Sequence, residues 1–366
     1  MSKFMLPGIV LFLFAMKVAA QTYPVESQKE LLLAIQKSKP DTNRISLQLK
    51  LGNYYHSKPL SAPVKPGEYK HNQDSAINLF NQALQLSIKL NEPDREYNAR
   101  DLIAECERDT DPEHSKQILL RAVTYYRKKG NTGKEARAWE RLAAAYYKNY
   151  TFNDQIPQKI SYFQHARSLY LQNHELIAAA GILTLIAAHR ILLKQFDLAE
   201  KDLQQSLAEY KASGYKKLQY TYMTLVDLEY AKGNYYRTIA YCLQGIKSTA
   251  AGEDKRYTSY FYWNAARSNY SVKKYQEALD WVQKAIDIDS GHSDYQYFLV
   301  ETLLALNEIE EALLTLNNIT KGAFPKTSWD TLNQYRCLAL YHAKKNNNDL
   351  TIIYYLRSPY NPQLSL

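Results

Sequence analysis

The chain has 366 residues, and its 46 Lys and Arg against 37 Asp and Glu give a formal net charge of +9. It contains 12 glycines and 12 prolines, about 3% of each, where an average protein has roughly 7% and 5%. This scarcity argues against a sandwich, a barrel or a Gly-rich phosphate-binding fold, because those folds use both residues in their turns. No proline occurs between Pro157 and Pro325, and so long a stretch without a helix breaker predicts successive helices.

Residues 1–20 have the pattern of a secretory signal peptide. Lys3 gives a basic start, an apolar run covers residues 5–16, and Val18-Ala19-Ala20 places small residues before a cleavage site. The alternative is a retained membrane anchor, but a run of about 12 residues is shorter than the ~20 that span a bilayer. We therefore expect cleavage after Ala20, no stable membrane insertion afterwards, and a periplasmic or secreted protein. Export and the lack of a long Lys/Arg run argue against nucleic acid as a partner.

The three cysteines are odd in number and far apart, with no CxxC pair. They are Cys106, Cys242 and Cys337. This pattern predicts no disulfide framework, and we interpret all three as small buried apolar residues.

A repeat runs through the rest of the chain. A small, a large and a small residue recur at positions i, i+4 and i+7, and successive copies begin 34 to 44 residues apart. These offsets place the three side chains on one face of a helix. A second apolar helix precedes each copy, so the unit is a helix-turn-helix. The copies are Ala76…Phe80…Ala83, Ser115…Leu119…Ala122, Lys159…Phe163…Ala166, Ala199…Leu203…Ser206, Thr238…Cys242…Gly245, Ala278…Val282…Ala285 and Ala312…Leu316…Ile319, with a degenerate one at Leu350…Tyr354…Arg357.

These units resemble the tetratricopeptide repeat (TPR) family. Trp139…Leu142-Ala143…Tyr146 matches the family's W-x2-L-G-x2-Y signature with Ala for Gly, and Leu51-Gly52…Tyr55 matches it with Gln48 in place of Trp. The resemblance implies an all-α, right-handed TPR-type α-solenoid of seven to eight helix-turn-helix repeats, in which stacked neighbours bury each other's apolar faces. We expect a capping helix within residues 21–41, the solenoid over 42–358 and a C-terminal tail over 359–366. Pro63, Pro66 and Gly67 predict one loop excursion over residues 60–71.

A narrower resemblance connects the first repeat to the exported TPR region of TPR-containing sensor histidine kinases. It is carried by Lys39-Pro40-Asp41-Thr42-Asn43-Arg44, Leu51-Gly52-Asn53-Tyr54-Tyr55 and Asp74-Ser75-Ala76. No kinase motif is present in the sequence, so the kinase activity is not carried over.

Chemistry-bearing motifs are absent from the sequence. Gly130-Asn131-Thr132-Gly133-Lys134 has too few residues between its glycines for a phosphate loop, and Glu135 stands where a hydroxyl residue is needed. The eight histidines include no HExxH and no i,i+4 pair, and we interpret His189 as a satisfied core histidine. The sequence therefore predicts no catalytic residues, no metal site, no cofactor and no enzyme activity.

The resemblance also implies a concave groove lined by the first helix of each repeat, at its second, fifth, ninth and twelfth positions. The ninth position changes from Ala104, Ala144 and Ala188 to charged residues in the later repeats. Tyr, Trp and Arg dominate binding hot spots, but a chain with 32 tyrosines also places some there by chance. The candidate groove residues are Tyr220, Asp227, Tyr230, Tyr260, Trp263, Arg267, Tyr270, Tyr297 and Glu301.

Two hypotheses of different class follow. The first is a non-catalytic scaffold of the cell envelope that holds a protein or peptide in this groove. The alternative is an extracytoplasmic signal-sensing input domain that belongs to, or works with, a two-component sensor histidine kinase.

Overall fold

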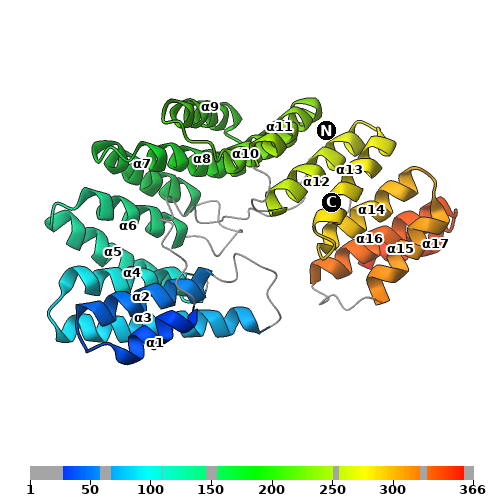
Figure 1. Ribbon diagram of the computed structural model, residues 1–366. Helices are drawn as coiled ribbons and strands as arrows, with labels where there is room; N and C mark the ends of the chain where they lie inside the picture. The colour runs from blue at the N-terminus through cyan, green and yellow to red at the C-terminus, as the bar shows by residue number, and fades with distance from the viewer. Residues whose placement is uncertain are drawn as a thin grey trace. The chain divides into compact units, whose positions relative to one another are not determined.

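The described part of the chain is a succession of α-helices without strands (Figure 1). The computed structural model describes residues 28–57, 67–108, 110–145, 155–249, 255–321 and 328–357. The predicted signal peptide and C-terminal tail lie outside these residues, as does most of the predicted loop over residues 60–71. The part of that loop from Glu68 onward is helical, because it already belongs to the long second helix of the first repeat. The all-α prediction is confirmed.

The helices divide into two compact units, one ending at His189 and one beginning at Arg190, here called the N-terminal and C-terminal units. Within the described residues, eight helix pairs follow a single short helix, α1, which packs against α2. The N-terminal unit contains α1 (Gln28–Lys37), α2 (Thr42–Ser57), α3 (Glu68–Lys89), α4 (Pro93–Glu107), α5 (Pro112–Lys128), α6 (Thr132–Ala145), α7 (Ile156–Gln172) and most of α8 (Leu176–Leu192).

The C-terminal unit continues the same alternation of first and second helices. It contains α9 (Phe196–Ala212), α10 (Gln219–Ala231), α11 (Tyr235–Ser248), α12 (Lys255–Ser271), α13 (Tyr275–Ile288), α14 (Ser293–Ala305), α15 (Ile309–Lys321), α16 (Ser328–Lys344) and α17 (Asn348–Arg357). None of the helices described here combines the length and apolar character that a membrane crossing requires.

Local sequence explains where the helices begin and end. Asp111 caps α5 by accepting a hydrogen bond from the backbone N–H of His114 at 3.1 Å, and Pro112 occupies the first helical position. The turns between helices use a residue with positive φ, such as Gly233 at 77°. After that residue, the backbone N–H of Asn234 donates to the carbonyl of Glu229 at 2.8 Å, which is the Schellman closure that satisfies the last carbonyls of a helix.

The repeat triplets form the core of the second helices. All 21 residues of the seven complete copies are buried. They lie in α3, α5, α7, α9, α11, α13 and α15. Glycines allow close helix approach: Gly245, the last member of its triplet in α11, lies against the ring of Phe261 in α12, and Gly52 of α2 lies against the ring of the triplet residue Phe80 in α3. The degenerate copy differs, since Leu350 and Tyr354 of α17 are only half-buried. The predicted repeat register therefore holds through α15.

Candidate functional site

The predicted groove residues lie on the first helices of the C-terminal unit. Within it, α10 packs against α12, and α14 against α16. Six of the nine residues are half-buried on these helices, whereas Tyr220, Tyr297 and Glu301 are buried. We define the aromatic stripe as Asp227 and Tyr230 of α10, Tyr260, Trp263, Arg267 and Tyr270 of α12, Glu301 of α14 and Arg336 of α16.

Arg267 occupies the middle of the aromatic stripe, between two aromatic rings. Its guanidinium carbon lies 4.2 Å from the centroid of Tyr230 and 4.6 Å from that of Trp263. One of its donors reaches the side-chain oxygen of Asn264 at 3.3 Å. Arg267 lowers the pKa of the nearby Asp227 and Glu301, but among the described residues it forms no ion pair with a carboxylate. Stacking on two rings holds the planar group in place while its edge retains further N–H donors.

Asp227 is the first of two carboxylates beside Arg267, and Tyr260 already engages it. The Tyr260 hydroxyl donates to Asp227 Oδ1 at 2.5 Å. Burial raises the pKa of Asp227 to about 6, against the lowering effects of the Tyr260 hydrogen bond and of Arg267. Burial and Asp227 together raise the pKa of Tyr260, so the tyrosine keeps its proton for this bond.

Glu301 is the second carboxylate, and its partner was not found from the sequence. Arg336 of α16 donates to Glu301 Oε1 through both Nε, at 2.8 Å, and a terminal nitrogen. Burial raises the pKa of Glu301, while Arg336 and then Arg267 lower it. Arg336 was missed because the last repeat is degenerate and gave no register from which to carry a groove position. Its side chain is 42% exposed.

Aromatic rings continue the aromatic stripe toward α14. Trp263 lies 5.6 Å from Tyr295, and Tyr270 lies 5.4 Å from Phe298, measured between ring centroids. Burial and the nearby Glu301 raise the pKa of Tyr270 to about 12. The predicted groove residues Tyr230, Tyr260, Trp263 and Arg267 thus lie together, whereas Tyr220 and Tyr297 are buried in the core.

Two buried polar atoms at or beside the aromatic stripe lack a hydrogen-bond partner among the described residues. They are the indole Nε1 of Trp263 and the hydroxyl of Tyr220. A buried donor without a partner costs about 1–3 kcal/mol. Asp227 Oδ1 and Glu301 Oε1 already accept hydrogen bonds from Tyr260 and Arg336, whereas the Trp263 indole N–H is a donor without a partner among the described residues. Such an arrangement accommodates a ligand that brings acceptors, above all a carboxylate.

The N-terminal unit carries a charged cluster that the sequence analysis also missed. Arg141 of α6 lies 3.5 Å from Asp101 and 3.4 Å from Glu105 of α4, and the Tyr126 hydroxyl donates to Asp101 at 3.1 Å. Burial raises the pKa of Asp101 to about 6. Burial by itself raises the pKa of Glu105, but Arg141 and His56 lower that pKa to about 2. The ninth groove positions of these helices are Ala104 in α4 and Ala144 in α6. The groove positions therefore did not predict the charged residues close to these alanines.

The remaining chemistry candidates are structural. The three cysteines are free and buried, as predicted. His189 is buried, its Nδ1 lies 2.7 Å from the Leu185 carbonyl, and burial lowers its pKa to about 4. Across the described ranges no group of His, Cys, Asp and Glu side chains is arranged to hold a metal ion.

Comparisons with known proteins agree with the helical repeat. Residues 270–330, which include α13 and α14, match the tetratricopeptide repeat family. The apo form of RapI superposes with a TM-score of 0.52 at 14% identity, over 86% of this chain and 96% of that one. A tetratricopeptide repeat protein from Parabacteroides merdae gives 0.51 at 14% identity, over 84% and 98%. No curated protein sequence matches the chain.

The repeat match and the two structures support a TPR protein, and the predicted TPR-type α-solenoid class is confirmed. At 14% identity the two structures bear on the fold alone. No catalytic family is identified, and nothing in the comparisons links the chain to sensor histidine kinases.

Proposed function

We propose that the protein is a non-catalytic binding scaffold whose aromatic stripe holds an acidic segment of a protein or peptide. The observation that carries this proposal is Arg267, fixed between Tyr230 and Trp263 without an ion-paired carboxylate among the described residues. A rigid guanidinium beside a buried indole N–H that lacks a partner is prepared for a carboxylate or a run of carbonyl oxygens. Tyr, Trp and Arg are also the residue types that dominate hot spots.

Charge at the edge of the aromatic stripe supports an acidic partner. Arg336 is 42% exposed while it bonds Glu301, and Asp227 is bonded by Tyr260. A basic ligand would have to compete with Tyr260 for Asp227 Oδ1 and with Arg336 for Glu301 Oε1. An acidic ligand needs only the donors that remain.

The test is binding of fluorescein-labelled dodecapeptides by anisotropy. Three peptides of equal length are compared: one rich in Glu, one rich in Ser and Gln, and one rich in Lys. We expect the acidic peptide to bind most tightly and Arg267→Glu to weaken it by about thirtyfold, which corresponds to a hot-spot loss of roughly 2 kcal/mol.

The matched control separates a site from a general attraction to a basic protein. Lys284 of α13 also lies over a tryptophan, with Nζ 4.3 Å from the Trp281 centroid, but it is exposed and outside the aromatic stripe. Lys284→Glu changes the net charge by the same amount and should leave the affinity within twofold. Equal losses in the two variants would show nonspecific attraction and contradict the proposal.

The envelope location belongs to the same proposal and is supported by the composition of residues 1–20. The mature protein is then expected to begin at Gln21, and N-terminal sequencing of envelope material measures this. Intact Met1 in the membrane fraction would contradict it. The alternative role as a sensor input domain is supported only by the sequence likeness around Lys39–Arg44, and no feature of the structure favours it.

A further inference from the structure

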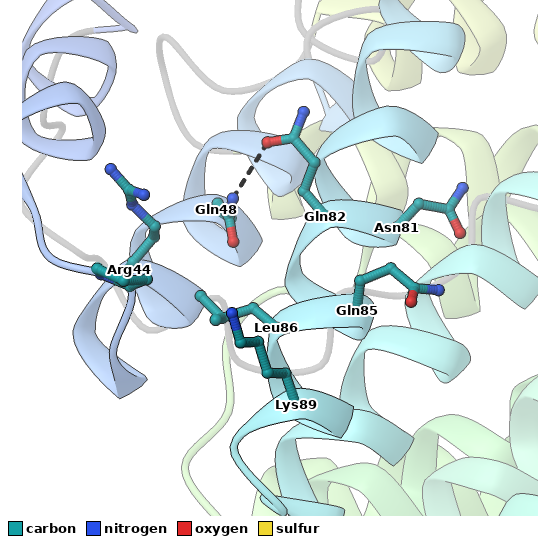
Figure 2. Close-up of a pocket in the computed structure, with 8 residues that line it drawn as sticks. Arg44, Gln48, Asn81, Gln82, Gln85, Leu86 and Lys89 are labelled. Carbon is teal, nitrogen blue, oxygen red and sulfur yellow. Dashed lines mark hydrogen bonds between the residues drawn. The ribbon is translucent and has the colours of Figure 1, made fainter.

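An open pocket of about 480 Å3 lies between α2 and α3 of the N-terminal unit (Figure 2). Its volume is in the range of small-molecule sites, roughly 300–1,000 Å3. The lining contains four amide side chains, two cationic residues and no carboxylate. The residues are Pro40, Arg44, Gln48, Asn81, Gln82, Gln85, Leu86 and Lys89.

At this pocket Gln48 stands where the TPR signature has tryptophan. In the α6/α7 repeat that position is Trp139, whose ring lies 5.2 Å from His165, two residues after the core residue Phe163. In the α2/α3 repeat the equivalent contact is a hydrogen bond from Gln48 Nε2 to Gln82 Oε1 at 3.1 Å, and Gln82 is two residues after Phe80. The smaller amide leaves open the volume that an indole would fill.

Gln48 also leaves a buried acceptor without a partner. The residue is 5% exposed, and its Oε1 has no hydrogen-bond partner among the described residues. Figure 2 shows this oxygen on the side of the amide opposite Gln82, toward Leu86 and Lys89. A buried acceptor in a pocket favours a ligand that supplies a donor, because the desolvation of the oxygen is then compensated.

Charge at the pocket comes mainly from Lys89. The Arg44 guanidinium is already bonded to Ser38 Oγ and to the Ile35 carbonyl, both at 3.0 Å, and it points away from the pocket in Figure 2. Lys89 is exposed and has no ion-pair partner in the described part of the chain. It lies in the last turn of α3, and the lining contains no acid to neutralise it.

We propose that this pocket binds a small hydroxylated carboxylate of the sugar-acid type. Gln48 Oε1 accepts from a ligand hydroxyl, and Lys89 contacts the carboxylate. The side-chain amides of Asn81 and Gln85 each offer a donor and an acceptor, which matches hydroxyl groups that both donate and accept. The ligand is either a free sugar acid or the terminal unit of an acidic polysaccharide, since both present this chemistry.

The experiment is calorimetric titration of the full chain with D-galacturonate as the probe and D-galactose as the uncharged reference. We expect saturable binding of galacturonate, at least tenfold tighter than that of galactose. Trigalacturonate distinguishes the two sources: tighter binding than the monomer indicates a polysaccharide end, and weaker binding indicates a free sugar acid. Equal affinity for galactose, or no saturable binding of either acid, would overturn the proposal.

Three variants localise the binding. Gln48→Trp fills the pocket with the residue of the TPR signature and should abolish binding while the protein stays folded. Lys89→Gln should weaken binding about tenfold, whereas Lys128→Gln, an exposed lysine in the last turn of α5, should not change it. If circular dichroism shows that Gln48→Trp unfolds the chain, Gln48→Leu replaces it. Unchanged affinity in both the Gln48 and the Lys89 variants would refute the assignment.

Discussion

A methyl group added at Gly52 tests the packing of the repeat directly. A Cβ built there would lie 2.7 Å from Cδ1 and 2.9 Å from Cζ of Phe80, whereas carbon atoms in contact are normally about 3.5–4.0 Å apart. Phe80 is fully buried, so its ring has little room to move. Overpacking costs about 1–3 kcal/mol, and the better helix propensity of alanine returns about 1 kcal/mol. We expect Gly52→Ala to lower the free energy of unfolding by up to about 2 kcal/mol.

The assay is urea unfolding followed by circular dichroism, with Gly133→Ala as the control. A Cβ at Gly133 would meet only the ends of the Asn173 and Glu175 side chains, at 2.9 Å each. Those ends can move, so this variant should gain up to about 1 kcal/mol from helix propensity. The double variant Gly52→Ala with Phe80→Leu should lose less free energy of unfolding than the sum of the losses in the two single variants. A stabilised Gly52→Ala would refute the close approach of α2 and α3.

Three further predictions concern charge and pH. Arg141→Met leaves Asp101 and Glu105 without their shared cation and should cost about 3 kcal/mol in urea unfolding; a neutral effect would contradict the cluster. Because burial lowers the pKa of His189 to about 4, the unfolded chain binds this proton first as the pH falls below about 6.5. The free energy of unfolding should then drop by about 2 kcal/mol between pH 7.5 and 5. In His189→Phe this contribution to the drop should be absent. Because burial raises the pKa of Asp227 to about 6, the acidic dodecapeptide should bind several-fold tighter at pH 5 than at pH 7.5, and Asp227→Asn should flatten this difference.

The repeat could be predicted from sequence because its core depends on side-chain size at fixed helical spacing. Ala278, Val282 and Ala285 are all fully buried, and the same triplet is recognisable without any partner being known. The first helices are less regular: in α14, Leu299 is half-buried and the neighbouring Val300 is buried. A helix that packs against three neighbours has a wide apolar face, so one-residue errors of register are harder to detect.

The site was predictable only where the repeat register could be carried forward. The groove positions that the TPR resemblance implies placed Trp263 and Arg267 on one helix face, and in the structure the Arg267 guanidinium lies over the rings of both Tyr230 and Trp263. Arg336 could not be placed, because its repeat is degenerate. The sequence showed only that Gln48 replaces the tryptophan of the signature. It did not predict the pocket, because an empty volume depends on how several neighbouring side chains pack.

The most direct test of the acidic-segment proposal is the indole N–H resonance of Trp263. In a spectrum of the 15N-labelled full chain, addition of the Glu-rich dodecapeptide should shift the Trp263 signal, assigned through Trp263→Phe, because its Nε1 lacks a partner among the described residues. The Trp139 signal serves as the internal control, since its Nε1 already donates to Glu135 Oε1 at 3.3 Å in the other unit. A saturable shift of Trp263 alone is the predicted result, and an unchanged Trp263 signal at saturating peptide would contradict the account.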